Sequence, residues 1–194
     1  MTARGPNGEA IPTFLSRQEL RLTKTVETVV TDLEMTEPHR PHVPMPANVK
    51  LMLMRLEEPT AHFYRYLYDA VGSGHLWVDR KRLNDCELLQ EIRAAGVEIW
   101  VLYVGGAPAG YFEVDGRAGD VVELKYFGLM SDFQGRGLGK WLMAEAIKAC
   151  WVREPKKVIV NTCTLDGPAA LPLYQKMGFV PVGREHKVLE LESN

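Results

Sequence analysis

Residues Gln134–Gly139 carry three glycines at alternate positions and stand between two apolar segments. Before them, Val121–Leu129 is rich in β-branched, aromatic and leucine residues, which is typical of a buried strand. After them, apolar residues recur every three or four positions from Leu142 to Trp151, which predicts an amphipathic helix. The glycines allow a tight turn and leave no side chains over the first helical N–H groups. These groups and the positive end of the helix dipole favour a bound phosphate.

The spacing of these glycines differs from that of two common nucleotide-binding loops. A P-loop requires Lys-Ser or Lys-Thr after its last glycine, whereas Lys140-Trp141 follows here. A dinucleotide fingerprint requires Gly-x-Gly-x-x-Gly, which Gly135, Gly137 and Gly139 do not match. The six residues alone leave a second interpretation open, a tight strand-to-helix turn without a ligand.

Three motifs together resemble the GCN5-related N-acetyltransferase (GNAT) family. Gln134–Gly139 fits the family pattern Gln/Arg-x-x-Gly-x-Gly/Ala, and Glu123 lies eleven residues before Gln134, where family members often carry a glutamate. Leu173–Phe179 is similar to the signature Leu-Tyr-x-Lys-x-Gly-Phe, whose tyrosine, here Tyr174, reaches the cofactor sulfur in the family. The resemblance covers Val49 to about Leu191.

Hydrophobic patterning predicts an α/β (α+β) chain whose elements follow the family order. Strands are expected at 50–56, 97–104, 109–114, 121–129, 157–165 and 180–191, and helices from Thr60 to Gly72, from Leu83 to Ala95, after the glycines and around Tyr174. The resemblance implies a GNAT-type mixed, mostly antiparallel sheet with helices on both faces.

Two parts of the chain are expected, an N-terminal extension at 1–46 and an acetyltransferase domain at 47–194. The extension contains a Pro-rich linker with His39 and His42, and before it a strand-like stretch at Thr23–Met35. The family usually ends with two strands after the Tyr174 helix, and this tail is barely long enough. We therefore expect Thr23–Met35 to supply an extra edge strand, within one chain or between the two chains of a homodimer.

The resemblance implies acetyl-CoA as co-substrate and no metal. Backbone amides of the loop would hold the pyrophosphate, assisted by two side chains, while the backbone of the preceding strand would pair with the pantetheine arm. The residues so implied are Phe127, Leu129, Gln134, Gly135, Arg136, Gly137, Leu138 and Gly139, with Asn161 as a weaker candidate. One departure is Gly167, because the family often has asparagine seven residues before the tyrosine. Asp166 is still expected to cap the following helix.

Two side chains are candidates for the proton transfers of acetyl transfer to an amine. Glu123 would remove the ammonium proton, directly or through a water, and Tyr174 would protonate the leaving thiolate. The alternative for Glu123 is a structural glutamate paired with a residue such as Lys125. The alternative for Tyr174 is an aromatic residue packed in the core.

The sequence says less about which residues bind the acceptor. Aromatic and acidic residues near the first two expected helices would suit a cationic amine, although core packing or a solvated surface explains them equally: Tyr64, Tyr66, Tyr68, Trp77, Asp79 and Asp85. The predicted function is an acetyl-CoA-dependent N-acetyltransferase acting on a small molecule or a protein. The alternatives are a non-catalytic CoA-binding sensor or interaction module and the same fold with another acyl-CoA.

Composition narrows the cellular setting and the partners. A net charge of −2 gives no electrostatic reason to expect nucleic acid or membrane binding. The three cysteines, Cys86, Cys150 and Cys163, lack metal-ligand spacing and are expected to be reduced thiols in or near the core. With no apolar signal segment, a cytoplasmic location is predicted.

Overall fold

The computed structural model describes residues 24–39 and 41–191, so parts of the expected extension 1–46 and the end of the expected domain at 194 lie outside the described residues. In the described part, seven strands form one sheet in the order β2-β3-β4-β5-β6-β1-β7. The strands are β1 Lys24–Met35, β2 Leu51–Arg55, β3 Val97–Val104, β4 Ala107–Asp115, β5 Val121–Leu129, β6 Lys157–Cys163 and β7 Val180–Leu191. The helices are α1 Ala61–Gly72, α2 Asp85–Ile92, α3 Leu138–Trp151 and α4 Ala170–Lys176, with the 3₁₀ turns η1 Ser73–His75, η2 Asp79–Lys81 and η3 Ser131–Phe133.

The chain divides into a large unit, Thr28–Lys187, and a small unit made of the two ends. Among the described residues, the small unit comprises 24–27 and 188–191, the outer parts of β1 and β7. The residues of the candidate site all belong to the large unit. The expected domain boundary at 46/47 stays a prediction.

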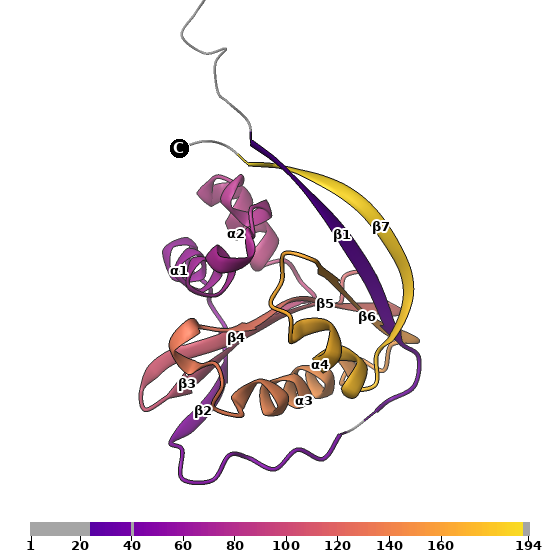
Figure 1. Cartoon of the computed structure of the whole chain (residues 1–194). Helices are drawn as coiled ribbons and strands as arrows, with labels where there is room; N and C mark the ends of the chain where they lie inside the picture. Colours follow the sequence, from indigo (N-terminus) through magenta and orange to yellow (C-terminus); the bar gives the residue numbers. More distant parts are fainter. Residues whose placement is uncertain (1–23, 40, 192–194) are drawn as a thin grey trace, which may run out of the picture. The chain divides into compact units, whose positions relative to one another are not determined.

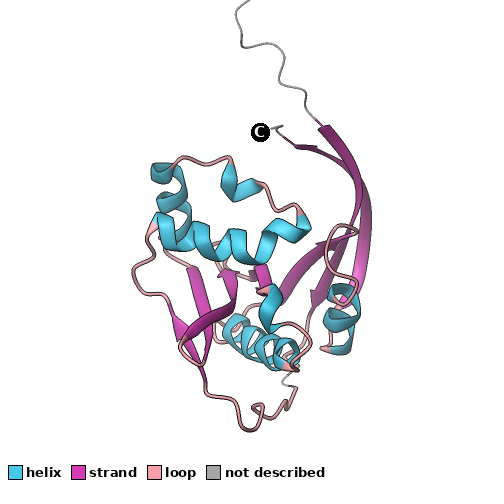
Figure 2. Ribbon diagram, turned by 60° about the vertical axis from the view of Figure 1, so that its left-hand side comes forward, coloured by secondary structure: helices cyan, strands magenta, loops and turns pink. Residues whose placement is uncertain are grey.

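Helices cover both faces of the sheet in the large unit, which confirms the predicted mixed α/β fold (Figures 1 and 2). Alternation along the strands produces this arrangement, because successive side chains point to opposite faces. Ile99 and Val101 of β3 pack with α1 and α2, whereas Leu102 belongs to the core formed with α3 and α4. Most strand pairs are antiparallel, and β5 with β6 is parallel.

Strand β1 lies inside the sheet, between β6 and β7, and not at its edge. Residues Val30–Met35 pair antiparallel with Val158–Cys163, and Leu33 and Met35 are buried. The strand-like pattern was correct, but the expected edge position is wrong. The physical reason is that β7 adds to the second side of β1. The apolar face of β1 covers core beside β6 and α3; the Trp151 indole N–H, for example, donates to the Met35 sulfur at 3.3 Å.

The parallel pairing of β5 with β6 is short. It joins Val121, Val122 and Glu123 to Lys157, Val158 and Ile159 and stops there. Beyond this point β5 continues on β4, as far as the pair Gly110–Leu129, while β6 continues on β1. We call this separation the β5/β6 divergence. It leaves one side of the β5 backbone, from Leu124 to Leu129, without a neighbouring strand among the described residues.

The cysteines correct one expectation. Cys150 is buried on α3 and Cys163 is half-buried, as expected, but Cys86 is exposed on α2. Because α2 packs only one face on the sheet, a residue two positions before buried Leu88 points outward. The prediction of a near-core position is therefore wrong for Cys86.

Candidate active site

The glycine loop, Gln134–Gly139, forms the entry to helix α3. Gly135 and Gly137 have φ values of 71° and 77°, a conformation that side chains disfavour, and Gly137 is the N-cap of α3. No side chain caps the helix, and a Cβ added at Gly135 or Gly137 would meet no atom within 4 Å. The first N–H groups of α3 therefore face open space, which is what an anion needs at a helix N-terminus.

Of the two polar side chains in the glycine loop, one is hydrogen-bonded within the protein and the other is exposed. The Gln134 side-chain amide donates to the backbone oxygen of Leu129 at 3.1 Å, so it ties the loop to the end of β5. The Arg136 guanidinium lies 5.2 Å from the centre of the Phe133 ring and is exposed. Arg136 is therefore the side chain of the loop that is free to meet a charged ligand.

Tyr174 of α4 lies against β5. Its ring packs edge-on to Phe127 at 6.4 Å and to Phe179 at 6.1 Å, and the residue is 6% exposed. Burial raises the pKa of Tyr174, and the nearby Asp166 carboxylate adds to the rise. The phenol therefore keeps its proton at neutral pH and is a potential proton donor beside the β5/β6 divergence.

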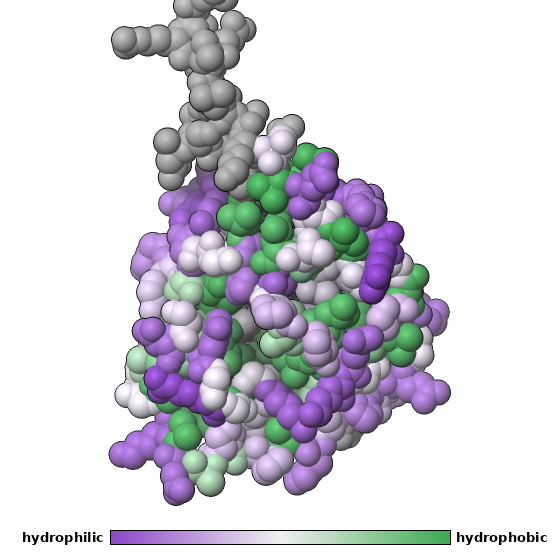
Figure 3. Space-filling model, viewed as in Figure 1, coloured by the Kyte–Doolittle hydropathy of each residue, from purple (hydrophilic) through white to green (hydrophobic). Residues whose placement is uncertain are grey.

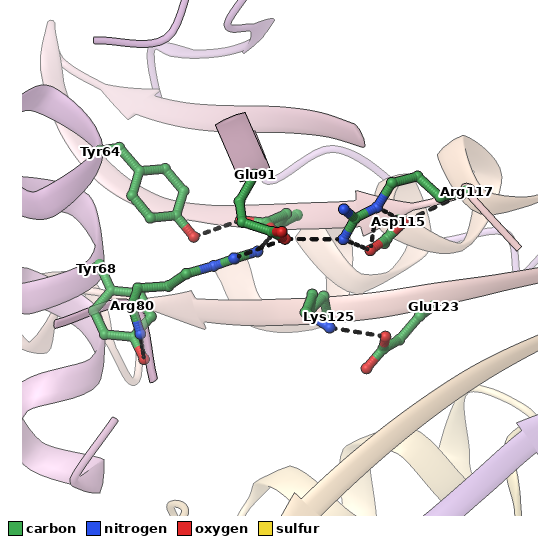
Figure 4. A network of polar contacts seen from close by, with 9 residues as sticks. Tyr64, Tyr68, Arg80, Glu91, Asp115, Arg117, Glu123 and Lys125 are labelled. Carbon is green, nitrogen blue, oxygen red and sulfur yellow. Dashed lines mark hydrogen bonds and ion pairs between the residues drawn. The ribbon is translucent and has the colours of Figure 1, made fainter. Parts of the chain in front are cut away.

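Glu123 stands where β5 and β6 part, and its carboxylate pairs with the ammonium of Lys125 at 3.1 Å (Figure 4). The side chains of Glu123 and Lys125 are 25% and 29% exposed, so water reaches both. The ion pair is the structural alternative that the sequence left open for Glu123. It does not remove Glu123 from solvent, and a base acting through water stays geometrically available.

Residues at the end of β6 depart from expectation. The Asp166 carboxylate accepts from the Thr162 hydroxyl at 2.7 Å and from the Cys163 N–H at 2.9 Å, whereas the N-cap of α4 is Ala169. The expected capping role of Asp166 is therefore wrong, because its carboxylate instead closes the turn after the strand. Asn161 is exposed on β6 opposite Asp32 of β1, on a strand that the divergence separates from β5.

A group of polar side chains that the sequence reasoning missed lies between the sheet and helices α1 and α2 (Figure 4). We call it the ionic cluster; its members are Tyr64, Arg80, Glu91, Glu113, Asp115 and Arg117. At its centre Arg80 donates to Glu113 at 2.7 Å, and the Tyr64 hydroxyl donates to the other oxygen of Glu113 at 2.5 Å. Arg80 is 5% exposed and Glu113 is fully buried. Two charged residues, Glu113 and Asp115, within the otherwise apolar strand β4 were the signal that could have identified this cluster.

The cluster continues toward the surface. The carboxylate of Glu91 binds Arg80 at 3.2 Å and Arg117 at 3.0 Å, and Arg117 also pairs with Asp115 at 2.7 Å. Hydrogen bonds from Arg117 lower the pKa of both Glu91 and Asp115. Burial raises the pKa of Glu113, and Arg80 with the Tyr64 hydroxyl opposes that rise. The two arginines thus hold three carboxylates together beneath α1 and α2.

The aromatic residues expected near the acceptor are mostly part of this packing. Tyr64 and Tyr68 are buried, and Trp77 packs 5.1 Å from Tyr126, whose ring lies 5.5 Å below the Arg80 guanidinium. Tyr64, Tyr68 and Trp77 are therefore engaged in packing, and a cation of the chain itself lies over the neighbouring Tyr126 ring.

The other expected acceptor residues lie outside this packing. Asp85 pairs with Arg65 at 2.8 Å, and Tyr66 and Asp79 are exposed.

In the view of Figure 1, apolar side chains reach the surface in the middle of the face, with hydrophilic residues around them (Figure 3).

Residues 24–39 and 41–191 contain neither a metal site nor a membrane-spanning helix. No set of three His, Cys, Asp or Glu side chains there is placed to hold a metal ion. None of the helices in that range is long and apolar enough to cross a membrane.

The family of the chain follows from comparison with known proteins. A model of the acetyltransferase (GNAT) family matches residues 53–179, more than half of the chain. The chain therefore belongs to this family, as its three motifs predicted. Membership supports acyl transfer from an acyl-CoA to an amine as its general class of activity. None of the curated protein sequences compared with the chain matches it significantly.

Solved structures share the fold at low identity. A protein of unknown function from Staphylococcus epidermidis is 17% identical with a TM-score of 0.55, over 87% of this chain and 64% of that one, so the chain spans less than two thirds of its length. A GNAT-family protein from Novosphingobium aromaticivorans is 15% identical with a TM-score of 0.58, over 89% and 68%. An aminoglycoside N-acetyltransferase in complex with CoA is 18% identical with a TM-score of 0.50, over 71% and 92%. At these identities the likeness concerns the fold alone.

Proposed function

We propose that this protein transfers an acetyl group from acetyl-CoA directly to an amine of a small molecule or a protein. The observation that supports this most is the open glycine loop at the start of α3, placed at the end of the strand that borders the β5/β6 divergence. An open cradle of N–H groups suits a pyrophosphate, and an unpaired strand side suits the amides of an extended pantetheine arm.

The residues present fit coenzyme A. Backbone N–H groups of Gly135–Gly139 would hold the pyrophosphate with help from the Arg136 side chain, while Gln134 keeps the loop in place. Backbone groups of Phe127 and Leu129 would pair with pantetheine, and Asn161 is a further candidate contact from β6. Acetyl-CoA supplies the activated acyl group.

Two side chains of this chain would move the protons. An alkyl ammonium with a pKa near 10.4 must lose a proton before it attacks, which costs about 4–5 kcal/mol at pH 7. Glu123 would accept that proton, directly or through water, from its partly exposed position beside Lys125. As the C–N bond forms and the C–S bond breaks, Tyr174 would donate its proton to the departing sulfur.

A non-catalytic CoA sensor is the second candidate, since the glycine loop alone suffices to bind. Use of another acyl-CoA is the third. Thiol release from acetyl-CoA, propionyl-CoA and succinyl-CoA, measured with the purified protein and a broad amine panel, separates them. We expect release with acetyl-CoA and at least one amine; tight acetyl-CoA binding without turnover on any amine or protein would favour the sensor.

The role of Glu123 has its own test. Glu123→Gln removes the base but keeps the shape, so we expect a kcat loss of about tenfold or more with unchanged acetyl-CoA affinity. Lys125→Met breaks the same ion pair and leaves the carboxylate. Equal losses in both variants would show that the pair matters only structurally.

A further inference from the structure

The chain between α1 and η2 forms a pinned turn, which we call the 73–77 turn. The backbone N–H of Trp77 donates to the Gly72 carbonyl at 3.2 Å, and the Trp77 ring packs so closely on Gly72 that a Cβ there would collide with it. Leu76 has φ 56° and ψ 37°, a left-handed conformation that costs a non-glycine residue about 1–2 kcal/mol. A strained residue held by well-made contacts is a reason to look for function at the turn.

His75 projects from this turn to the opposite side of the site. Its Nδ1 donates to the backbone oxygen of Leu165 at 3.4 Å, and its Cε1 lies 3.5 Å from the position that a Cβ of Gly167 would take. Leu165 and Gly167 belong to the connection from β6 to α4, the helix of Tyr174. The imidazole therefore links α1, which packs on β4 and β5, to the segment that follows β6. The contact therefore joins the β5 side of the divergence to its β6 side.

The contact with Leu165 also determines which ring nitrogen is free. A carbonyl oxygen only accepts, so Nδ1 carries the proton and Nε2 of the neutral imidazole carries a lone pair. Nε2 makes no hydrogen bond with a described residue, and His75 is half-exposed. The carboxylate of Asp166, the residue after Leu165, is already engaged by Thr162 and Cys163. The geometry leaves one unoccupied hydrogen-bond acceptor at this end of the site.

We propose that His75 is an acceptor-binding residue, whose Nε2 accepts a hydrogen bond from the amino group of the acceptor and orients it toward the acyl group. This inference rests on the proposed transferase function. The acceptor is an amine with at least one N–H donor for Nε2. Gly167 matters to the same contact, because a side chain larger than alanine would push the imidazole away.

The first test separates acceptor binding from chemistry. Initial rates are measured with sisomicin, spermidine, tyramine and a lysine-containing peptide as acceptors. His75→Leu should raise the acceptor KM by about tenfold or more, the effect of a hydrogen bond to a charged group, with kcat and the acetyl-CoA KM nearly unchanged. His75→Gln, which keeps one donor and one acceptor, should restore most of the affinity. A fall in kcat at constant acceptor KM would overturn the inference.

Two matched controls address indirect effects. His62→Leu changes an exposed histidine of α1 and should leave the acceptor KM unchanged. Gly167→Ala adds a Cβ at ordinary contact distance, 3.5 Å from the imidazole. The two further methyl groups of Gly167→Val should displace the ring, so we expect only the valine variant to reproduce the His75→Leu effect. Equal acceptor KM values for both Gly167 variants and wild type would contradict the proposed contact.

Nitrogen-15 spectra of the histidine side chains distinguish this inference from the transferase proposal. In the CoA-loaded protein, the His75 signal, assigned by its absence from His75→Gln, should show the Nδ1–H tautomer and an Nε2 shift when one of these amines is added. An amine-dependent shift without thiol release would keep the inference and overturn the transferase. Thiol release without a shift, or an Nε2–H tautomer in the free protein, would overturn the inference alone.

Discussion

The glycine loop and the ionic cluster belong to elements packed on opposite faces of the sheet, and their polar groups are arranged in opposite ways. In the loop, backbone N–H groups at the start of α3 point into open space and no side chain caps them. In the cluster, the buried carboxylate of Glu113 receives both Arg80 and Tyr64. Unsatisfied exposed donors are ready for a ligand, whereas buried charges that are paired with each other are costly to separate. The glycine loop is therefore open to a ligand, whereas the polar groups packed beneath α1 and α2 are engaged with one another.

The largest expected effect concerns the ionic cluster. Arg80→Met leaves the Glu113 carboxylate buried without its cation, which should lower the free energy of unfolding by about 3–5 kcal/mol. Urea unfolding at pH 7 measures the change. Lys81→Met, which breaks the exposed pair of Lys81 with Asp69, should cost at most about 1 kcal/mol. A loss no greater than this in Arg80→Met would remove the difference between the cluster and the surface.

The same variant has a predictable pH dependence. Arg80 lowers the pKa of Glu113 against the effect of burial, so its removal leaves burial to raise that pKa further above the unfolded value. The folded state then holds a proton that the unfolded state has released, and stability falls as pH rises through the interval between the two pKa values. Arg80→Met should therefore be closer to wild type at pH 5 than at pH 7. Arg80→Met with Glu113→Gln should lose this dependence.

Tyr174→Phe tests whether the Tyr174 phenol, beside the β5/β6 divergence, is the proton donor of the reaction. Loss of the proton donor should reduce kcat by about 100-fold or more, while the acetyl-CoA Kd stays within about twofold. Steady-state rates and calorimetric titration measure the two quantities. Tyr103→Phe, which removes the hydroxyl of a half-buried tyrosine on β3, is the control and should behave as wild type. Unchanged turnover in Tyr174→Phe would exclude the phenol from the mechanism.

Two glycines of the loop should respond differently to alanine. Gly137→Ala places a side chain at φ 77° and should cost about 1–2 kcal/mol of stability together with donor affinity. Gly139→Ala lies inside α3, where its Cβ would find the nearest atom at 3.7 Å, and should be neutral or slightly stabilising. Thermal unfolding and acetyl-CoA titration compare them. Equal stability of the two variants would contradict the strain assigned to Gly137.

The smallest expected effect concerns Arg136, the charged side chain of the loop. Arg136→Ala should leave stability unchanged and weaken acetyl-CoA binding a few-fold at low salt, with a smaller difference at high salt because exposed charges are screened. Titrations at two salt concentrations measure it. A large, salt-independent loss would mean that the loop depends on this side chain more than on its backbone.

Local sequence patterns predicted much of the fold. The strand, the glycines and the helix were expected at 121–129, 134–139 and 142–151, and β5, the glycine loop and α3 occupy those places. Helix α2 shows the limit of such patterns, since it ends at Ile92 although the periodicity extends to Ala95. Its start is better defined, because Asn84 and Glu87 form a capping box there.

Position in the sheet was harder to predict than secondary structure. The alternation in Thr23–Met35 indicated a strand but not its neighbours, and the expected edge position proved wrong. An interior strand and an edge strand differ in what lies on their second side. For β1 that neighbour is β7, nearly 150 residues later in the chain.

The amino-acid sequence by itself determined the family, the order of the elements and the position of the glycine loop, because these depend on residues that are neighbours along the chain. Only the tertiary structure decided which polar side chains meet. Tyr64 and Arg80 reach Glu113 across 49 and 33 residues, and His75 reaches Leu165 across 90. Spacing along one chain carries no record of such contacts, because folding brings them together only when the helices close over the sheet.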